Sequence, residues 1–403
     1  MTFGIFIRRI IRFKLIKTRE SFPNFYYFAV RFLSVILALV KYRTLVFSGK
    51  RAHWFLQVQK GKRYLNDFWT PLNSIDIPLR LSLHNVNKIE FPNHTGAQAL
   101  TLNQFNPCIV AIDNGIQICW RISDIVFHPA TKLNGDSLSN PTIGVCNGIG
   151  IATIQRNDLL NRATLSQPRI LIAANEFERS TLHKIQDIHG RSMDFEDPRF
   201  IPEYPHLILM HGRYTGRIPD RPAPRYDIVL FNLESNEIKL LIPQNRHKAE
   251  KNWVPICTDN EKHILLRSTK PFAVVAVDKE DHHLSEISWD SADFGEIHNG
   301  SNFLLLDEDL YIRVVRVKIN LEGLRGVRLN FIMMHNLEFK EVGRTKPFIF
   351  NDFGYEICNS ITEFEGKIFF AWGMNDSAGY IGHIDRDILQ NWIRNHKITT
   401  DIS

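Results

Sequence analysis

From about residue 52 onward, short runs rich in Val, Ile, Phe and Tyr alternate with turns of two to four residues. Such runs are typical of β-strands, and a turn between two of them predicts a hairpin. The clearest turn is Asp113-Asn114-Gly115, because Asn-Gly supplies the positive φ of a tight turn between Cys108–Asp113 and Ile116–Ile122. Four more pairs of runs predict hairpins in the same way: Tyr226–Asn232 with Glu237–Ile242, Asn302–Leu306 with Leu310–Ile319, Val327–Met334 with Glu338–Val342, and Ser360–Phe364 with Lys367–Trp372.

Helix-period patterns are scarce in this part of the chain. Only Arg386–Asn395 has the pattern of a helix, and Asp385 before it is a candidate N-cap. Hairpins in series without alternating helices predict a sandwich, a barrel or a propeller. A body of about 350 residues is large for one sandwich and suits five or six propeller blades. We therefore expect an all-β fold, in which residues 52–403 form a β-propeller that ends in a short helix.

Residues 1–51 differ from the rest of the chain in charge and in pattern. They contain 11 Lys and Arg against the single acidic residue Glu20, whereas the remaining residues carry 38 basic and 42 acidic side chains. The basic excess lies outside the body, which argues against a nucleic-acid-binding surface there. We predict a basic amphipathic helical extension, for which a location on the surface of an anionic membrane is one of two equally supported interpretations. The alternative, which stays open, is a helix packed on the body or on another subunit.

Neither a membrane span nor a secretory signal is indicated. Arg31 interrupts the apolar stretch 24–41, and the longest uncharged run is the ten residues Ser21–Val30, whereas a span needs about 20 apolar residues. No small-residue cleavage site follows Val40. The five cysteines are widely spread and form no C-x-x-C pair, which favours a reducing compartment. We expect a cytoplasmic protein with peripheral contact at the inner face of the membrane.

Common catalytic motifs, such as G-x-S-x-G, H-E-x-x-H and the phosphate-binding loop, are absent from the sequence. Polar residues gather instead in short motifs around Asn106, Asp197, Lys251, His298 and Glu356. The last three intervals between these residues are 54, 47 and 58, and each is about one propeller blade long. Because equivalent positions of successive blades meet at the central axis, the motifs predict one shared pocket.

The composition of these motifs suits a sugar, because carboxylates and amides bind hydroxyl groups and an indole face stacks on a sugar ring. For Trp253 and Trp372, packing inside a blade is an alternative role. The acidic residues occur one per motif rather than in clusters, so no metal site is predicted. The candidate substrate-binding residues are Asn106, Arg121, Glu196, Arg199, Lys251, Asn252, Trp253, His298, Glu356 and Asp376.

Two of the motifs, Glu196-Asp197-Pro198-Arg199 and the block from Glu356 to Asp376, resemble those of glycoside hydrolase family 130. Members of this family are five-bladed β-propellers best known as β-mannoside phosphorylases. The resemblance extends from about Asn106 to Asp385 and implies a five-bladed propeller. It implies the following roles: general acid for Asp197, binding of the reactive sugar for Asn106 and Arg121, phosphate or acceptor binding for Lys251, and binding of sugar hydroxyls for Asp376.

The chain also departs from the family pattern. Family members often have a His where this chain has Arg316, and the phosphate-binding Arg residues have only Arg213 and Arg217 as candidates, by position alone. Residues 1–51 lie outside the resemblance. These departures bear on whether phosphate is a substrate.

The sequence therefore predicts a carbohydrate-active enzyme that performs inverting glycosyl transfer or phosphorolysis on a β-mannoside or related glycan. Its partners would be an oligosaccharide or a sugar phosphate, with inorganic phosphate as co-substrate, no other cofactor, and an oligomeric state left open. A hydrolase is the first alternative, and it needs a second carboxylate as base, for which Glu196, Glu250 and Glu356 are candidates. The second alternative is a non-catalytic glycan-binding or scaffold propeller that works with a membrane glycosyltransferase.

Overall fold

A computed structural model of the chain describes residues 79–89, 103–123, 147–159, 165–172, 192–215, 226–244, 250–259, 261–269, 272–287, 297–321, 324–350, 356–374 and 378–398. The predicted extension of residues 1–51, and with it the boundary at residue 52, lies outside these ranges. Within them, no helix is long and apolar enough to cross a membrane.

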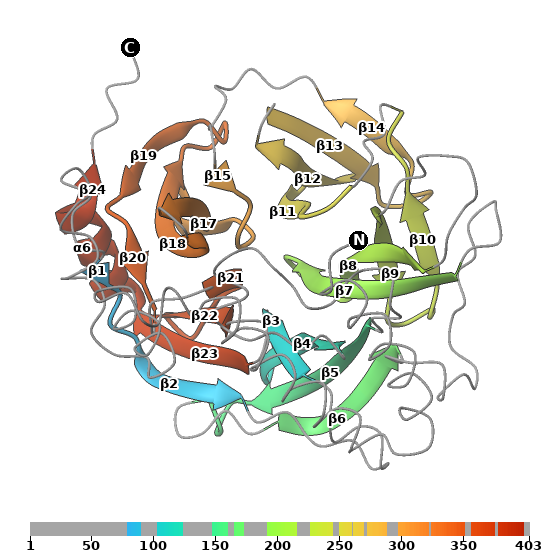
Figure 1. The fold of residues 1–403 in the computed structure, drawn as a ribbon, viewed down its shortest axis with the longest axis horizontal. Coiled ribbons are helices and arrows are strands. Elements are labelled where there is room, and N and C mark those ends of the chain that lie inside the picture. The colour runs from blue at the N-terminus through green and yellow to red at the C-terminus, as the bar shows by residue number, and fades with distance from the viewer. Residues whose placement is uncertain are drawn as a thin grey trace, which may run out of the picture.

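The described strands form five sheets that stand around a central axis (Figure 1). Four sheets have four strands each and one has eight. Neighbouring strands in the sequence pair with each other in most cases, as expected for hairpins in series. The predicted all-β, propeller-like architecture is confirmed.

Three of the sheets are meanders of strands that follow one another in the chain. The first consists of β3 (Asn103–Ile112), β4 (Gly115–Ser123), β5 (Asn147–Gln155) and β6 (Leu165–Ile172). The second consists of β7 (Ser192–Ile201), β8 (Tyr204–Thr215), β9 (Tyr226–Asn232) and β10 (Ile238–Leu241). The third consists of β11 (Val254–Thr258), β12 (Lys262–Thr269), β13 (Phe272–Asp278) and β14 (Leu284–Ile287).

The other two sheets combine strands from distant parts of the chain. The eight-stranded sheet consists of β15 (Ile297–His298), β16 (Leu304–Asp307), β17 (Leu310–Leu321), β18 (Leu324–His335), β19 (Glu341–Thr345), β20 (Phe348–Ile349), β1 (Leu79–Arg80) and β24 (Lys397–Ile398). The last sheet consists of β21 (Glu356–Phe364), β22 (Lys367–Met374), β23 (Ala378–Asp385) and β2 (His84–Ile89).

Strands from the first part of the described chain complete the last two sheets. Strand β2 pairs antiparallel with β23, so that Ile89 lies opposite Gly379, and β1 pairs parallel with β20. Figure 1 shows β2 along the outer side of β23, next to the sheet of β3 to β6. The ring is therefore held together by pairing between segments that are far apart in the sequence.

All five predicted hairpins are confirmed. The Asn-Gly turn joins β3 to β4, in which Ile112 pairs with Gly115, and Gly115 has a φ of +145°, a conformation that favours glycine. The other four hairpins join β9 to β10, β16 to β17, β18 to β19, and β21 to β22.

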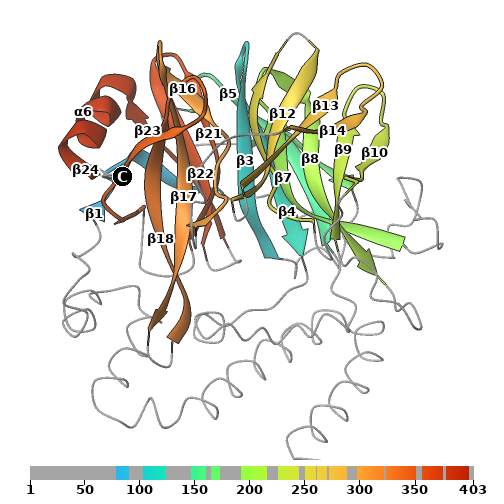
Figure 2. The ribbon, with the colours of Figure 1, turned by 90° about the horizontal axis from the view of Figure 1, so that it is seen from above.

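The predicted C-terminal helix is also confirmed, as α6 (Arg386–His396). Asp385 occupies the N-cap position, but its side chain makes no capping hydrogen bond. The helix buries Leu389 and Ile393 and lies on the outside of the ring (Figure 2). Its apolar side thus belongs to the core shared with the neighbouring strands.

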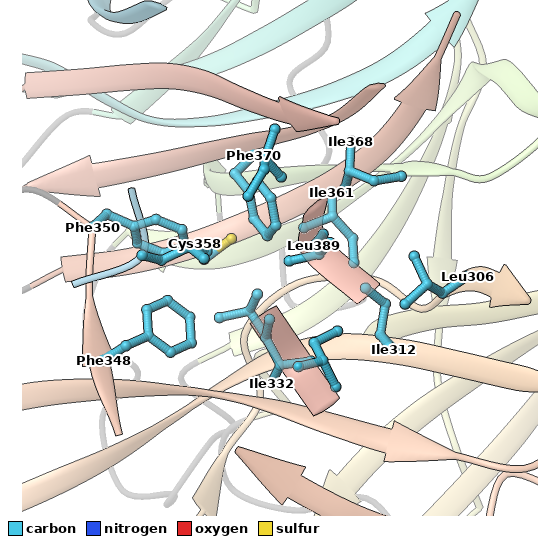
Figure 3. Packing of buried hydrophobic residues seen from close by; sticks show 14 of the residues in the cluster. Leu306, Ile312, Ile332, Phe348, Phe350, Cys358, Ile361, Ile368, Phe370 and Leu389 are labelled. Atoms are coloured by element: carbon cyan, nitrogen blue, oxygen red, sulfur yellow. The ribbon is translucent and has the colours of Figure 1, made fainter. Parts of the chain in front are cut away.

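The largest apolar cluster lies between the last two sheets and α6 (Figure 3). Trp372 is fully buried there, stacked on Phe350 at 4.8 Å and on Tyr380 at 5.6 Å between ring centroids. Both faces of its indole are therefore covered by aromatic rings. The structure places Trp372 in the packing role and leaves no indole face for a sugar.

Candidate active site

The site is built on the first strands of two neighbouring sheets, β3 and β7, which contact each other. Each strand contains a β-bulge, where the register shifts after Phe105 in β3 and after Glu196 in β7. Asn106 and Asp197 follow these points with φ of +50° and +44°. Asn and Asp tolerate this left-handed backbone better than most residues, and a bulge changes the direction of a side chain. The two bulges turn the side chains of Asn106 and Asp197 toward each other.

One carboxylate oxygen of Asp197 receives two donors. Asn106 Nδ2 donates a hydrogen bond of 2.9 Å to Asp197 Oδ1, and Arg121 Nη1 lies 3.3 Å from the same atom. The Asp197 side chain is 20% exposed, whereas that of Arg121 is 7% exposed. The structure thus brings together the predicted catalytic residue and two predicted sugar-binding residues, with the carboxylate as their most exposed group.

Glu196 and Asn147 hold Arg121 in place. Arg121 Nη2 lies 3.1 Å from Glu196 Oε1, and Arg121 Nε and Nη2 donate to Asn147 Oδ1 at 2.9 and 2.8 Å. Asn147 Nδ2 in turn donates to Glu196 Oε1 at 3.1 Å. Glu196 therefore acts on the site through Arg121, and Asn147 belongs to the site although the sequence analysis does not identify it.

Asp197 is ionised in this arrangement. Burial alone would raise the pKa of its carboxyl group, but the charges of Arg121 and Lys251 and the hydrogen bond from Asn106 outweigh burial and hold the pKa well below its usual range. An ionised carboxylate only accepts hydrogen bonds. The site without substrate therefore presents an acceptor for a hydroxyl proton.

His211, in β8, is the other residue that the sequence analysis misses. Its Nδ1 lies 3.9 Å from Asp197 Oδ2, and its Nε2 accepts a 2.8 Å hydrogen bond from the backbone N–H of Asn252. Burial lowers the pKa of His211 to about 3, so the ring is neutral at pH 7. The only sequence signal is a His directly after the apolar run 207–210, and such a residue is more often part of a core than of a site.

Lys251 and Asn252 lie in the connection between β10 and β11, just before the first strand of the next sheet. Lys251 is exposed, and its Nζ lies 4.0 Å from the centre of the Tyr226 ring, a cation–π contact. Its charge lowers the pKa of Asp197, as expected for a predicted phosphate- or acceptor-binding residue near the carboxylate. Asn252 has a φ of +61° and contacts His211 through its backbone.

Arg199 is a predicted substrate-binding residue that the structure ties to the backbone. Its Nη1 donates to the carbonyl of Gly300 and, at 2.7 Å, to the carbonyl of Asn359. The residue is 3% exposed, and burial lowers its pKa to about 10. Arg199 therefore links its own strand β7 to the backbone of the last two sheets, and in this arrangement it holds strands rather than a ligand.

Two further predicted site residues, Trp253 and Glu356, are fully buried and bound to groups other than Asp197. Trp253 is fully buried, and its Nε1 donates to Glu250 Oε2 at 3.1 Å, so it packs in a core and offers no sugar-stacking face. Glu356 is fully buried and accepts hydrogen bonds from Asn330 Nδ2 at 3.2 Å and from the N–H of Phe350 at 2.9 Å.

His298 is exposed at the end of β15, where it pairs with Arg316. Asp376 and Arg217 lie outside the described residues, and for Arg213 only the backbone in β8 is described. The predictions for these residues as ligands of sugar or phosphate therefore remain predictions.

Glu250 is bound to a buried guanidinium. Arg267 Nη2 and Nε donate to its two carboxylate oxygens at 2.6 and 3.2 Å. Glu196 forms an ion pair with Arg121, and Glu356 accepts hydrogen bonds from a backbone N–H and a side-chain amide. Each of the three candidate second carboxylates is therefore buried and already bound to a donor. A base that must accept a proton from water is therefore not evident among these three.

The Asn106 side chain fits only because residue 373 is glycine. A Cβ added to Gly373 would overlap Asn106 Oδ1. We expect Gly373→Ala to displace the Asn106 amide from Asp197 and to lower activity about tenfold or more. Because the added Cβ would also lie 3.0 Å from the backbone N of Asn106, the free energy of unfolding should fall as well, by about 1–3 kcal/mol. Activity and denaturant unfolding of the variant check this.

Stability should depend on pH through the buried histidines, among which His211 and His335 have the most strongly lowered pKa. Burial lowers the pKa of His211 and of His335 to about 3, whereas an unfolded His titrates near about 6.5. Between these values the unfolded chain binds more protons, so the free energy of unfolding should fall by about 1–2 kcal/mol for each His between pH 7 and 5. Urea unfolding at both pH values measures this, and His335→Gln should remove part of the slope. A stability that is flat across this window would contradict the expectation.

No family model matches the chain, and no match to a curated protein is found. Similar solved structures include a β-1,2-mannobiose phosphorylase from Listeria innocua, 11% identical, with 77% of this chain and 100% of that chain covered and a TM-score of 0.49. A mannose phosphorylase from Leishmania mexicana is 10% identical, with 75% and 89% covered and a TM-score of 0.45. A GDP-Man-dependent mannosyltransferase from the same organism is 12% identical, with 75% and 90% covered and a TM-score of 0.45. These carbohydrate-active enzymes differ in reaction type, so the reaction of this chain has to be decided by its own residues.

Proposed function

We propose that this protein is a five-bladed β-propeller enzyme that transfers a glycosyl group with inversion between a sugar phosphate and a hydroxyl acceptor. Asp197 is the acid/base. In synthesis, the acceptor oxygen forms a bond to the anomeric carbon, the bond from that carbon to phosphate breaks, and Asp197 takes the acceptor proton. Asp197 then passes this proton to the released phosphate. In the reverse direction, phosphorolysis, the incoming hydrogen phosphate supplies the proton, and Asp197 donates it to the leaving oxygen. The sugar we propose is a β-mannoside or related glycan, on the motif resemblance of Glu196-Asp197-Pro198-Arg199.

The observation that carries this proposal is the way in which Asp197 is held. Asn106 and Arg121 both bind Oδ1, so the carboxylate is oriented through one oxygen. The partly exposed side chain is ionised, as a base must be before it accepts a proton. A general base or acid of this kind accelerates a reaction by about 10²–10⁴-fold.

The arrangement of the other carboxylates favours phosphate over water as the second reactant. An inverting hydrolase needs a second carboxylate to activate water. Glu196 is bound to Arg121, Glu250 to Arg267, and Glu356 to the N–H of Phe350. Phosphate carries its own negative charge and needs a cation instead, and the exposed Lys251 near Asp197 supports this role.

The alternative outside catalysis is a glycan-binding or scaffold propeller that works with a membrane glycosyltransferase. The buried contacts of Asn106 and Arg121 with Asp197 would then serve structure. Peripheral membrane contact through residues 1–51 is compatible with both functions and forms part of the proposal. The catalytic function is favoured because Asp197 keeps 20% of its side chain exposed, so that a substrate hydroxyl can reach the carboxylate.

The test is an assay of the full chain with mannose 1-phosphate and a panel of sugar acceptors, followed by the reverse reaction on β-mannosides with and without phosphate. Phosphate release together with a new oligosaccharide supports the proposal. Cleavage of β-mannosides at the same rate without phosphate would establish the hydrolase. Glycan binding without turnover in either direction would favour the scaffold.

A further inference from the structure

A chain of hydrogen bonds across three sheets fixes which nitrogen of His211 carries a proton. The backbone N–H of Asn252 donates to His211 Nε2 at 2.8 Å. A backbone N–H can only donate, so Nε2 must present its lone pair, and a neutral imidazole then carries its hydrogen on Nδ1. His211 Nδ1 has no hydrogen-bond partner among the described residues, and it faces Asp197 Oδ2 at 3.9 Å.

The residue that supplies this N–H is itself held from the next sheet, through its carbonyl group. The carbonyl of Asn252 accepts a 2.8 Å hydrogen bond from Asn299 Nδ2, and Asn299 Oδ1 accepts one of 3.1 Å from Arg313 Nη1. Arg313 is fully buried, and its Nε donates to His335 Nε2 at 3.2 Å. Because Asn252 has a left-handed backbone, which costs about 1–3 kcal/mol when it is not stabilised by its surroundings, these bonds account for its conformation.

We infer that His211 is a positioning residue for Asp197 and that its Nδ1 donates a hydrogen bond to Asp197 Oδ2. Asn252, Asn299 and Arg313 keep the His211 ring in the tautomer with hydrogen on Nδ1. The catalytic consequence of this inference rests on the proposed function of Asp197. Oδ1 is already bound by Asn106 and Arg121. A donor on Oδ2 would fix the rotation of the carboxylate and leave the remaining lone pair of Oδ2 for the substrate hydroxyl.

The distance of 3.9 Å is longer than a hydrogen bond, and catalytic hydrogen bonds are often long in free enzymes and shorten in the substrate complex. A shift of about 1 Å by either side chain closes it. The surroundings favour the neutral ring that the tautomer requires. Burial lowers the pKa of His211 to about 3. The positive charges of Lys251, Arg199 and Arg121 also lower this pKa, whereas the negative charge of Asp197 raises it.

The direct test is nitrogen NMR of the full chain labelled with ¹⁵N-histidine, in which the signals missing from a His211→Gln sample identify His211. We expect a protonated Nδ1 and an unprotonated Nε2 from pH 6 to 8, and a shift of the Nδ1 signal in Asp197→Asn. The opposite tautomer, an imidazolium, or no response to Asp197→Asn would overturn the inference. These measurements need no substrate, so they decide the tautomer and the contact even if the proposed reaction proves wrong.

The kinetic test compares two replacements of His211. The amide nitrogen of Asn can take the place of Nδ1, and the amide of Gln can take the place of Nε2. His211→Gln therefore removes the donor to Asp197, and we expect its kcat to be about 10–100-fold below that of His211→Asn, with similar KM values. Equal kcat in the two variants, with both folded by circular dichroism, would show that His211 contributes only to packing. A lack of transfer activity in the wild type would instead count against the proposed function, and the NMR result would still stand.

Discussion

Asp197→Asn is expected to abolish most of the glycosyl transfer activity while the protein stays folded. The amide cannot take a proton from the acceptor or return it to the leaving oxygen, so the rate should fall by about 10²–10⁴-fold in both directions. Measurement of kcat with mannose 1-phosphate and an acceptor checks this result. Binding of the sugar should change less than kcat, because the lost step occurs in the transition state.

Folding should survive this change for three physical reasons. Asn has the same shape as Asp, and it tolerates the φ of +44° at this position. Arg121 keeps a carboxylate partner in Glu196 at 3.1 Å, so no buried guanidinium loses all of its counter-charge. The matched control is Asp309→Asn, the same substitution at an exposed turn, which should leave both rate and stability unchanged. Full activity in Asp197→Asn would exclude Asp197 as the acid/base.

The strands and turns could be predicted because their signals are local. Asn114-Gly115 and the alternation around it specify one hairpin without reference to the rest of the chain. The pairing of β2 with β23 has no such signal, since its partners are far apart in the sequence and each strand is a short apolar run. Propeller closure is therefore a property of the tertiary structure that periodicity alone does not reveal.

The site likewise has a part that local sequence motifs predict and a part that depends on the tertiary structure. The link between Asn106, Arg121 and Asp197 follows from motifs that the sequence displays, and the structure brings all three together. The role of His211 could not be predicted from the sequence, because a single His in an apolar strand carries no motif. Only the pairing of β7 with β8 places it opposite Glu196, next to Asp197. Trp253 is the opposite case, a residue that the motif predicts for the site and that the structure places in a core. Its indole N–H is bound by Glu250, so the side chain can be fully buried.

Arg267→Met is expected to give the largest loss of stability. Arg267 and Glu250 form a buried pair whose side chains are only 4% and 2% exposed, and the substitution leaves the Glu250 charge buried without that guanidinium. Breaking a buried pair from one side costs about 3–5 kcal/mol. Urea unfolding measures the loss, and Lys340→Met, which breaks the exposed pair with Glu338, should cost no more than about 1 kcal/mol.

A second substitution separates a structural role of Glu250 from a catalytic one. If Glu250 only balances Arg267, then Arg267→Met combined with Glu250→Gln should recover most of the lost stability, because the double variant no longer buries an unpaired charge. Such a variant should also retain glycosyl transfer, since Asp197, Asn106 and Arg121 are untouched. If Glu250 were instead the base of a hydrolase, the double variant would lose turnover even though its stability recovers, because the amide of Gln cannot accept a proton from water. The pair of measurements therefore tests the fold and the choice between phosphate and water in a single set of proteins.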